Sequence, residues 1–103
     1  MKNQEIANIL YEIADFLEME GVKFKPYAYQ KAAITIETLE EDIEEIYKKG
    51  GREALEKIPG IGKGIAQKIE EYLKTGKIKY HQDLKKKTPV NMEELTAIEG
   101  LGP

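Results

Sequence analysis

A proline followed by three alternating glycines constrains this chain more than any other feature. The run Ile58-Pro59-Gly60-Ile61-Gly62-Lys63-Gly64 lies between two segments with apolar residues at helical spacing, 53–58 and 62–75. Pro59 ends the first helix, and the glycines permit a tight reversal at backbone angles that side chains resist. The second helix then begins with uncovered main-chain N–H groups, which attract anions. The sequence therefore predicts two helices joined by a phosphate-binding turn.

This turn resembles the helix-hairpin-helix motif of DNA repair proteins, which holds the sugar-phosphate backbone without reading bases. A partial second copy, Leu95 to Pro103, repeats the apolar-x-Gly-apolar-Gly core, and the chain stops where the next phosphate-binding helix should begin. We therefore expect an N-terminal piece of a longer protein. Its expected units are a helical DNA-binding domain over 1–87, with the hairpin at 53–75, and a truncated second hairpin over 88–103. Thr88-Pro89 marks the boundary.

The other expected elements are also helical, so the fold class is all-α. Asn3 is expected to cap a helix over 3–19 that Gly21 ends, and Pro26 suits the first turn of a helix over 26–39. The acidic run 40–45 is expected to be a solvated connection and helix start, in preference to a metal site, and Ile43 to Tyr47 to form a short turn that Gly50-Gly51 breaks. A brief helix is expected over 82–86. The apolar residues expected to be buried or to anchor these elements are Ile6, Ile9, Leu10, Ile13, Ala14, Phe16 and Leu17, then Ala28, Ala32, Ala33, Ile36 and Leu39, then Ile43, Ile46 and Tyr47.

Composition excludes several classes of site. With 103 residues the chain has room for one small core, and with no cysteine it can form neither disulfides nor thiolate metal sites. The single histidine, His81, is expected at the surface and cannot build a zinc site. No stretch is apolar enough to span a membrane, and the N-terminus lacks the apolar region of a signal peptide. These features predict an intracellular protein of the cytoplasm or nucleoid.

Charge is divided unevenly along the sequence, although the net charge is only −3. Residues 1–56 carry 7 Lys and Arg against 13 Asp and Glu, whereas residues 57–88 carry 9 Lys against 3 acidic residues. Attraction to a polyanion depends on the local field, because salt screens charges beyond about 8–10 Å. The positive segment contains the glycine turn, and this coincidence favours DNA as the partner.

Two further runs flank the turn in order: Lys25-Pro26-Tyr27-Ala28-Tyr29-Gln30-Lys31-Ala32-Ala33 before it and Leu73-Lys74-Thr75-Gly76-Lys77-Ile78 after it. With these runs, the chain resembles the N-terminal part of family X DNA polymerases, the DNA polymerase beta-like repair enzymes. The resemblance implies a monomeric domain that holds the 5′-phosphate side of gapped or nicked DNA in base excision repair. The parent would be a DNA-directed DNA polymerase, a nucleotidyltransferase whose Mg²⁺-binding carboxylates lie beyond this fragment. The fragment itself would be at most a 5′-deoxyribose phosphate lyase.

Lys68 occupies the position of the family's Schiff-base lysine, which makes it the candidate catalytic residue. Helical spacing places it on the rim of the apolar face, where partial desolvation and nearby cations such as Lys63 lower the pKa of an amine. A neutral amine could attack C1′ of an abasic deoxyribose. The alternative is that Lys68 lies beside the core and contacts a phosphate. Both interpretations stay open at this point.

The resemblance also assigns DNA-binding roles to other residues. Lys25 and Tyr29 match residues around the 5′-phosphate, although Tyr29 could equally be a core residue. The main-chain carbonyls of Ile58 and Ile61 match positions that hold a monovalent cation, Na⁺ or K⁺, which bridges to phosphate. The full set of candidate DNA-binding residues is Lys25, Tyr29, Gly60, Gly62, Lys63, Gly64 and Lys68.

Two departures weaken the expected 5′-phosphate pocket. Glu56 and Gly64 stand where beta-type enzymes carry phosphate-binding lysines, and Lys57 and Lys63 lie one position away with side chains that should point elsewhere. One alternative is therefore a non-enzymatic helix-hairpin-helix module that tethers another activity to DNA. Another is a helical protein-interaction domain that uses the acidic N-terminal half, which the phosphate-binding turns argue against.

Overall fold

Five helices account for the regular structure of the part of the chain that the computed structural model describes, residues 1–87, and no strand occurs there. The helices are α1 (Asn3–Met19), α2 (Lys25–Glu37), α3 (Ile43–Glu56), α4 (Lys63–Thr75) and α5 (Lys79–Lys87). The all-α prediction is therefore confirmed. The predicted boundary at Thr88-Pro89 and the predicted second hairpin lie outside the described residues. Within the described range, no helix combines the length and the hydropathy needed to cross a membrane.

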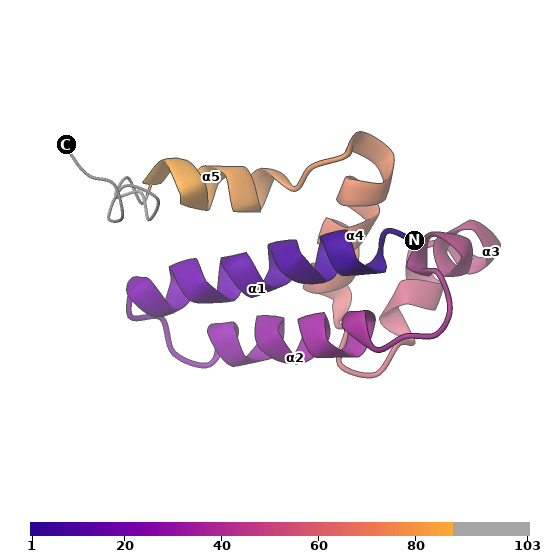
Figure 1. The fold of residues 1–103 in the computed structure, drawn as a ribbon, viewed down its shortest axis with the longest axis horizontal. Coiled ribbons are helices and arrows are strands. Elements are labelled where there is room, and N and C mark those ends of the chain that lie inside the picture. The colour runs from indigo at the N-terminus through magenta and orange to yellow at the C-terminus, as the bar shows by residue number, and fades with distance from the viewer. Residues whose placement is uncertain (88–103) are drawn as a thin grey trace.

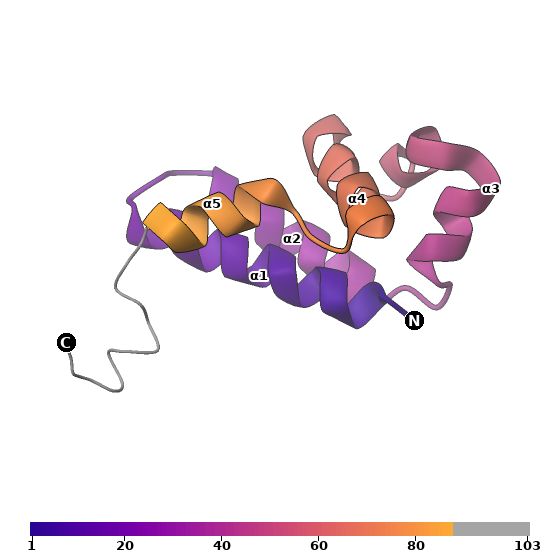
Figure 2. The same cartoon turned by 90° about the horizontal axis from the view of Figure 1, so that it is seen from above.

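Helices α1 and α2 form an antiparallel pair that lies side by side in Figure 1, and α2 lies behind α1 in the view of Figure 2. Gly21, with φ of +80°, ends α1 as expected. Its N–H donates to the Glu18 carbonyl, and the N–H of Val22 donates to the Leu17 carbonyl at 3.0 Å. This double closure satisfies carbonyls at the helix end and needs a residue that tolerates positive φ. The chain therefore reverses directly into α2.

The core draws apolar side chains from all five helices and from the turn before α4. Ala28 and Leu39 are exceptions to the predicted stripe of α2, because Ala28 is exposed and Leu39 is only half-buried. Ala28 lies about 100° around the helix from the buried Tyr29, outside the stripe that faces α1. The core residues are Ile6, Ala7, Leu10, Ile13, Ala14, Phe16, Leu17, Tyr29, Ala32, Ala33, Ile36, Ile43, Leu55, Ile58, Ile61, Ile65, Ala66, Ile69 and Leu84.

Asn3 does not cap α1, contrary to the prediction. Its side chain is buried and reaches the start of α3, where Nδ2 donates to the Glu41 carbonyl and Oδ1 accepts the N–H of Ile43, both at 2.9 Å. An amide side chain offers one donor and one acceptor group, so Asn3 satisfies two main-chain groups at once. Asn3 thus joins the first turn of α1 to the α2–α3 connection.

The acidic run before α3 supplies a helix cap. Asp42 accepts the N–H of Glu44 at 3.0 Å, as expected of an aspartate at the N-cap position. The break predicted at Gly50-Gly51 is confirmed, because Gly51 has non-helical angles, with φ of +70° and ψ of −161°. A kink at this residue divides α3 into two helical pieces, of which the second runs to Glu56. The glycine pair therefore ends the first piece and redirects the chain into the second.

Helix α5 packs along α1 (Figure 2), and His81 is one of the residues that hold it there. His81 is 5% exposed, so the prediction that it lies at the surface is wrong. Its Nε2 lies 2.7 Å from Oε1 of Glu12, and its ring lies beside that of Phe16 with 6.5 Å between centroids. Ile78 is fully buried just before the helix begins. The position of His81 therefore depends on its contact with Glu12, which lies 69 positions away in the sequence.

Candidate nucleic-acid interface

The turn between α3 and α4 is closed by short main-chain hydrogen bonds. The N–H of Ile58 donates to the Leu55 carbonyl at 3.1 Å, and the N–H of Ile61 donates to the Ile58 carbonyl at 3.0 Å. Both isoleucines are buried, which fixes the base of the turn in the core. Gly60 has φ of +87°, a conformation in which side chains are strained. The predicted proline-glycine reversal is therefore present, and Pro59 and Gly60 at its tip are exposed.

The first turn of α4 presents uncovered N–H groups at this tip. Gly62 is the N-cap and has no side chain with which to cap the helix, while its carbonyl accepts the N–H of Ala66 at 2.9 Å. The N–H groups of Lys63, Gly64 and Ile65 precede the first intrahelical bond and have no acceptor within the helix. A Cβ placed on Gly62 or Gly64 would meet no atom within 4 Å. An anion can therefore approach the positive end of the helix dipole without obstruction.

Lys68 lies one turn further along α4 and is partly buried. Its Nζ is 4.9 Å from the centroid of the Tyr80 ring, within the range of a cation–π contact. Desolvation by burial lowers the pKa of the Lys68 amine, and the positive charge of Lys25 lowers it further, while the negative charge of Glu71 opposes both. The effective cation is thus Lys25 of α2, whereas the sequence suggested Lys63. The Lys68 amine therefore loses its proton more readily than the amine of a fully exposed lysine.

Tyr29 joins the Lys68 site through Tyr80. The two tyrosine rings stack with 6.3 Å between centroids and an interplanar angle of 25°. Tyr29 is 7% exposed, and burial, with a smaller effect of Tyr80, raises the pKa of Tyr29 to about 12. Its hydroxyl therefore stays protonated at neutral pH and can donate a hydrogen bond, but it is a poor base. Tyr29 is both a core residue and a neighbour of this site, so the two interpretations of it are compatible.

Tyr80 is the member of this group that sequence reasoning missed. It follows the first residue of α5, and its contacts are to residues 51 and 12 positions earlier in the chain. No local pattern marks such a residue. The available signal was that Tyr80 is an aromatic residue within the lysine-rich run Lys77-Ile78-Lys79-Tyr80 that follows the hairpin. The structure thus brings Lys25, Tyr29, Lys68 and Tyr80 together from three helices.

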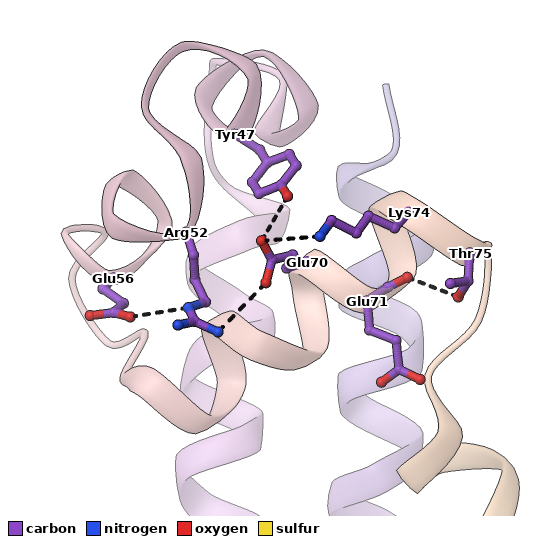
Figure 3. A network of polar contacts seen from close by, with 7 residues as sticks. All are labelled: Tyr47, Arg52, Glu56, Glu70, Glu71, Lys74 and Thr75. Atoms are coloured by element: carbon purple, nitrogen blue, oxygen red, sulfur yellow. Dashed lines mark hydrogen bonds and ion pairs between the residues drawn. The ribbon is translucent and has the colours of Figure 1, made fainter.

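Glu56 takes part in a network that joins α3 to α4, which Figure 3 shows. Arg52 lies 3.8 Å from Glu56 and 3.6 Å from Glu70, and the Tyr47 hydroxyl donates to Glu70 at 2.7 Å. Lys74 adds a contact to Glu70 at 3.8 Å. The Tyr47 hydrogen bond is the main cause that lowers the pKa of the Glu70 carboxyl, with smaller effects of Lys74 and Arg52. Glu56 therefore has a structural partner, and its charge lies on the α3 side of the hairpin.

The remaining lysines predicted near the phosphate lie on the surface. Lys63 is the first residue of α4, and both it and Lys57 are exposed. The carbonyls of Ile58 and Ile61, which the sequence offered as cation ligands, belong to the same turn. The Ile58 carbonyl has one lone pair in use, by the N–H of Ile61, and a carbonyl oxygen has two. Carbonyl oxygens are hard ligands, the type that an alkali cation takes.

Comparisons with known proteins agree with this geometry. A family model described as a helix-hairpin-helix domain matches residues 1–78. The chain is also similar, at 31% identity over 103 residues, to the DNA polymerase/3′-5′ exonuclease PolX of Bacillus subtilis (strain 168). That similarity covers 99% of this chain and 17% of the relative, so the chain spans about one sixth of the relative's length. Both results confirm the resemblance that was stated from the sequence.

Proposed function

The chain belongs to the helix-hairpin-helix domain family, a family of DNA-binding units, and from that premise we propose that it is the DNA-binding domain of a family X repair polymerase. Its contact with DNA would be made by the turn, where the N–H groups of Lys63 and Gly64 face solvent at a helix N-terminus. Lys57 and Lys63, both exposed, flank the turn in sequence and add positive charge there. Such contacts bind the phosphate backbone irrespective of sequence and weaken as salt concentration rises.

We further propose that the preferred DNA is gapped or nicked and that the 5′-phosphate end is held near Lys25 and Lys68. Two cations that lie close enough to depress the pKa of Lys68 repel each other, and a phosphate dianion between them would relieve that repulsion. The Tyr29 hydroxyl, which stays protonated, can donate to the same phosphate. A monovalent cation held by the carbonyls of Ile58 and Ile61 would add positive charge at the turn.

The observation that supports an enzymatic role is the environment of Lys68, a partly buried amine of lowered pKa beside the turn. The neutral amine would add to the C1′ aldehyde of an abasic 5′ deoxyribose phosphate and lose water to form an imine. Loss of a proton from C2′ then breaks the C3′–O bond and leaves a 5′-phosphorylated DNA end. Hydrolysis of the imine releases the sugar phosphate and restores the amine.

The test uses borohydride, which reduces an imine to a stable amine and so traps protein on DNA with an incised abasic 5′ end. Wild-type protein should be trapped, whereas Lys68→Arg should bind the DNA but give no covalent product, because an arginine side chain supplies no primary amine. Lys74→Arg is the matched control on the same helix and should be trapped like wild type, since Lys74 contacts only Glu70 among the acidic residues described.

A non-enzymatic tethering module is the second candidate. It is favoured by Glu56, which occupies the position of an expected phosphate-binding lysine and is paired with Arg52. If wild type and Lys68→Arg bind DNA equally well and neither is trapped, the domain is a clamp and the lyase proposal is wrong. If Lys68→Arg is trapped as efficiently as wild type, another amine carries the chemistry.

A further inference from the structure

The ring of Tyr80 is the meeting point of three helices. It belongs to α5, stacks on Tyr29 of α2 and lies beneath the Nζ of Lys68 of α4, at 4.9 Å from its centroid. An ammonium group over an aromatic face is attracted by the ring quadrupole, most strongly where water is partly excluded. The cation–π contact with Tyr80 therefore favours one position of the Lys68 ammonium group.

The backbone on either side of Tyr80 is held firmly. Ile78 is fully buried, and the N–H of Lys79 donates to Oε2 of Glu71 at 2.9 Å. On the other side, the buried His81 contacts Glu12 of α1 at 2.7 Å. While α5 is packed on α1, these anchors at residues 78, 79 and 81 restrict the backbone around Tyr80, and stacking on Tyr29 restricts its ring. The ring is thus a rigid surface against which a flexible lysine can be held.

Apart from Tyr80, little in the site restricts the position of the Lys68 side chain. A lysine side chain has four rotatable carbon–carbon bonds and no preferred direction in water. Lys25 repels it, and Glu71, the carboxylate that acts on its charge, already accepts a hydrogen bond from the main chain at Lys79. The ring of Tyr80 attracts the ammonium without neutralising it and without forming a hydrogen bond that would have to be broken before the amine reacts.

The geometry points to Tyr80 as the positioning residue of the Lys68 amine, a role that rests on the proposed function of Lys68. Tyr80 acts on Lys68 through the face of its ring, and its hydroxyl is not required for this role. Tyr80→Phe should therefore keep the amine in place, whereas Tyr80→Leu should release it while still filling space beside α2. Tyr72→Leu is the matched control, because Tyr72 is also half-buried and its recorded polar contact is to Glu5 of α1, at 2.6 Å.

The first measurement needs no DNA. In the NMR spectrum of the free protein, the Hε protons of Lys68 should be shifted upfield by the ring current in wild type, Tyr80→Phe and Tyr72→Leu, and should return to ordinary lysine values in Tyr80→Leu. The second measurement is the rate of borohydride trapping at saturating abasic DNA. It should fall about tenfold in Tyr80→Leu, because an amine that has lost its fixed position is less often placed for attack, and stay near the wild-type rate in the other two variants.

The outcomes separate this inference from the function on which it rests. An unshifted Lys68 resonance in wild type, or trapping of Tyr80→Leu at the wild-type rate, would overturn the role of Tyr80. Loss of trapping in Tyr80→Phe as well would also overturn it, because the hydroxyl would then be essential. If no variant is trapped but the shift is lost only in Tyr80→Leu, Tyr80 does position Lys68, and it is the lyase proposal that fails.

Discussion

Replacing Gly64 by alanine should stabilise the fold and at the same time weaken DNA binding. Gly64 is the second residue of α4, is exposed, and would present an added Cβ to open space. Alanine is favoured over glycine in a helix by about 0.5–1 kcal/mol, and a site in the first turn should gain roughly the lower figure. For a domain of this size that gain raises Tm by roughly 2–4 °C.

The effect on binding has the opposite sign because the methyl group occupies the space through which a phosphate would approach the N–H groups of Lys63 and Gly64. The lysine that beta-type enzymes carry at this position offsets such a loss with its own charge, which alanine lacks. A hydrogen bond to a charged group is worth about 1.5–3 kcal/mol, so loss of one contact should weaken binding by about tenfold or more. Calorimetric unfolding and fluorescence anisotropy with labelled gapped duplex measure the two effects on the same preparation.

Gly76→Ala is the control at the other end of α4. Gly76 has φ of +85° with no atom within 4 Å of an added Cβ, so alanine there should cost about 1–2 kcal/mol through backbone strain alone. Its affinity for DNA should be unchanged despite the lower Tm. Equal or tighter DNA binding by a stabilised Gly64→Ala protein would refute the reasoning, since the tip of the turn could not then be the contact surface.

Two further predictions concern the charge of Lys68 and the anchoring of α1. Lys25→Gln removes a cation that disfavours the ammonium form, so the pKa of Lys68 should rise towards its ordinary value and the reactive neutral fraction at pH 7 should fall; a Lys68 Cε titration that is unchanged by the substitution would contradict this. Asn3→Leu leaves the buried N–H of Ile43 without its acceptor and should cost about 1–3 kcal/mol in urea unfolding, whereas the exposed Asn8→Leu should cost much less, and equal losses would argue against the assigned hydrogen bonds.

The features that the sequence predicted well are those encoded locally. Pro59 and Gly60 define the reversal through their own backbone preferences, and the helical spacing on either side needs no distant partner. Asn3 was assigned the wrong role because a residue at the start of a helix usually caps it, whereas here a connection 38 positions away offered two unsatisfied main-chain groups. The N-cap propensity of asparagine indicated one possible role for Asn3, but its contacts with the α2–α3 connection determine the role that it has.

The candidate site shows the same division. The position of Lys68 on the rim of α4 followed from helical periodicity, but the identity of the groups around it did not. Lys25 of α2 lies 43 positions before Lys68 in sequence, and Tyr80 of α5 lies 12 positions after it. Their proximity to Lys68 depends on how α2 and α5 pack. A sequence pattern can indicate that an amine is partly desolvated, but only the packing shows which cation repels it and which ring supports it.

The interface has two parts, the phosphate-binding turn and the Lys68 site, and only the second depends on α5 through Tyr80. The free energy needed to open each part locally therefore differs. The turn is secured by the core and by the contacts of Glu70 across α3 and α4, whereas α5 is held mainly along α1. A transient excursion in which α5 detaches would return Lys68 to bulk water and leave the N–H groups of α4 in place. In such conformers the turn can still bind a phosphate backbone, but the Lys68 amine is no longer desolvated. DNA binding and amine reactivity therefore need not decline together as the temperature rises.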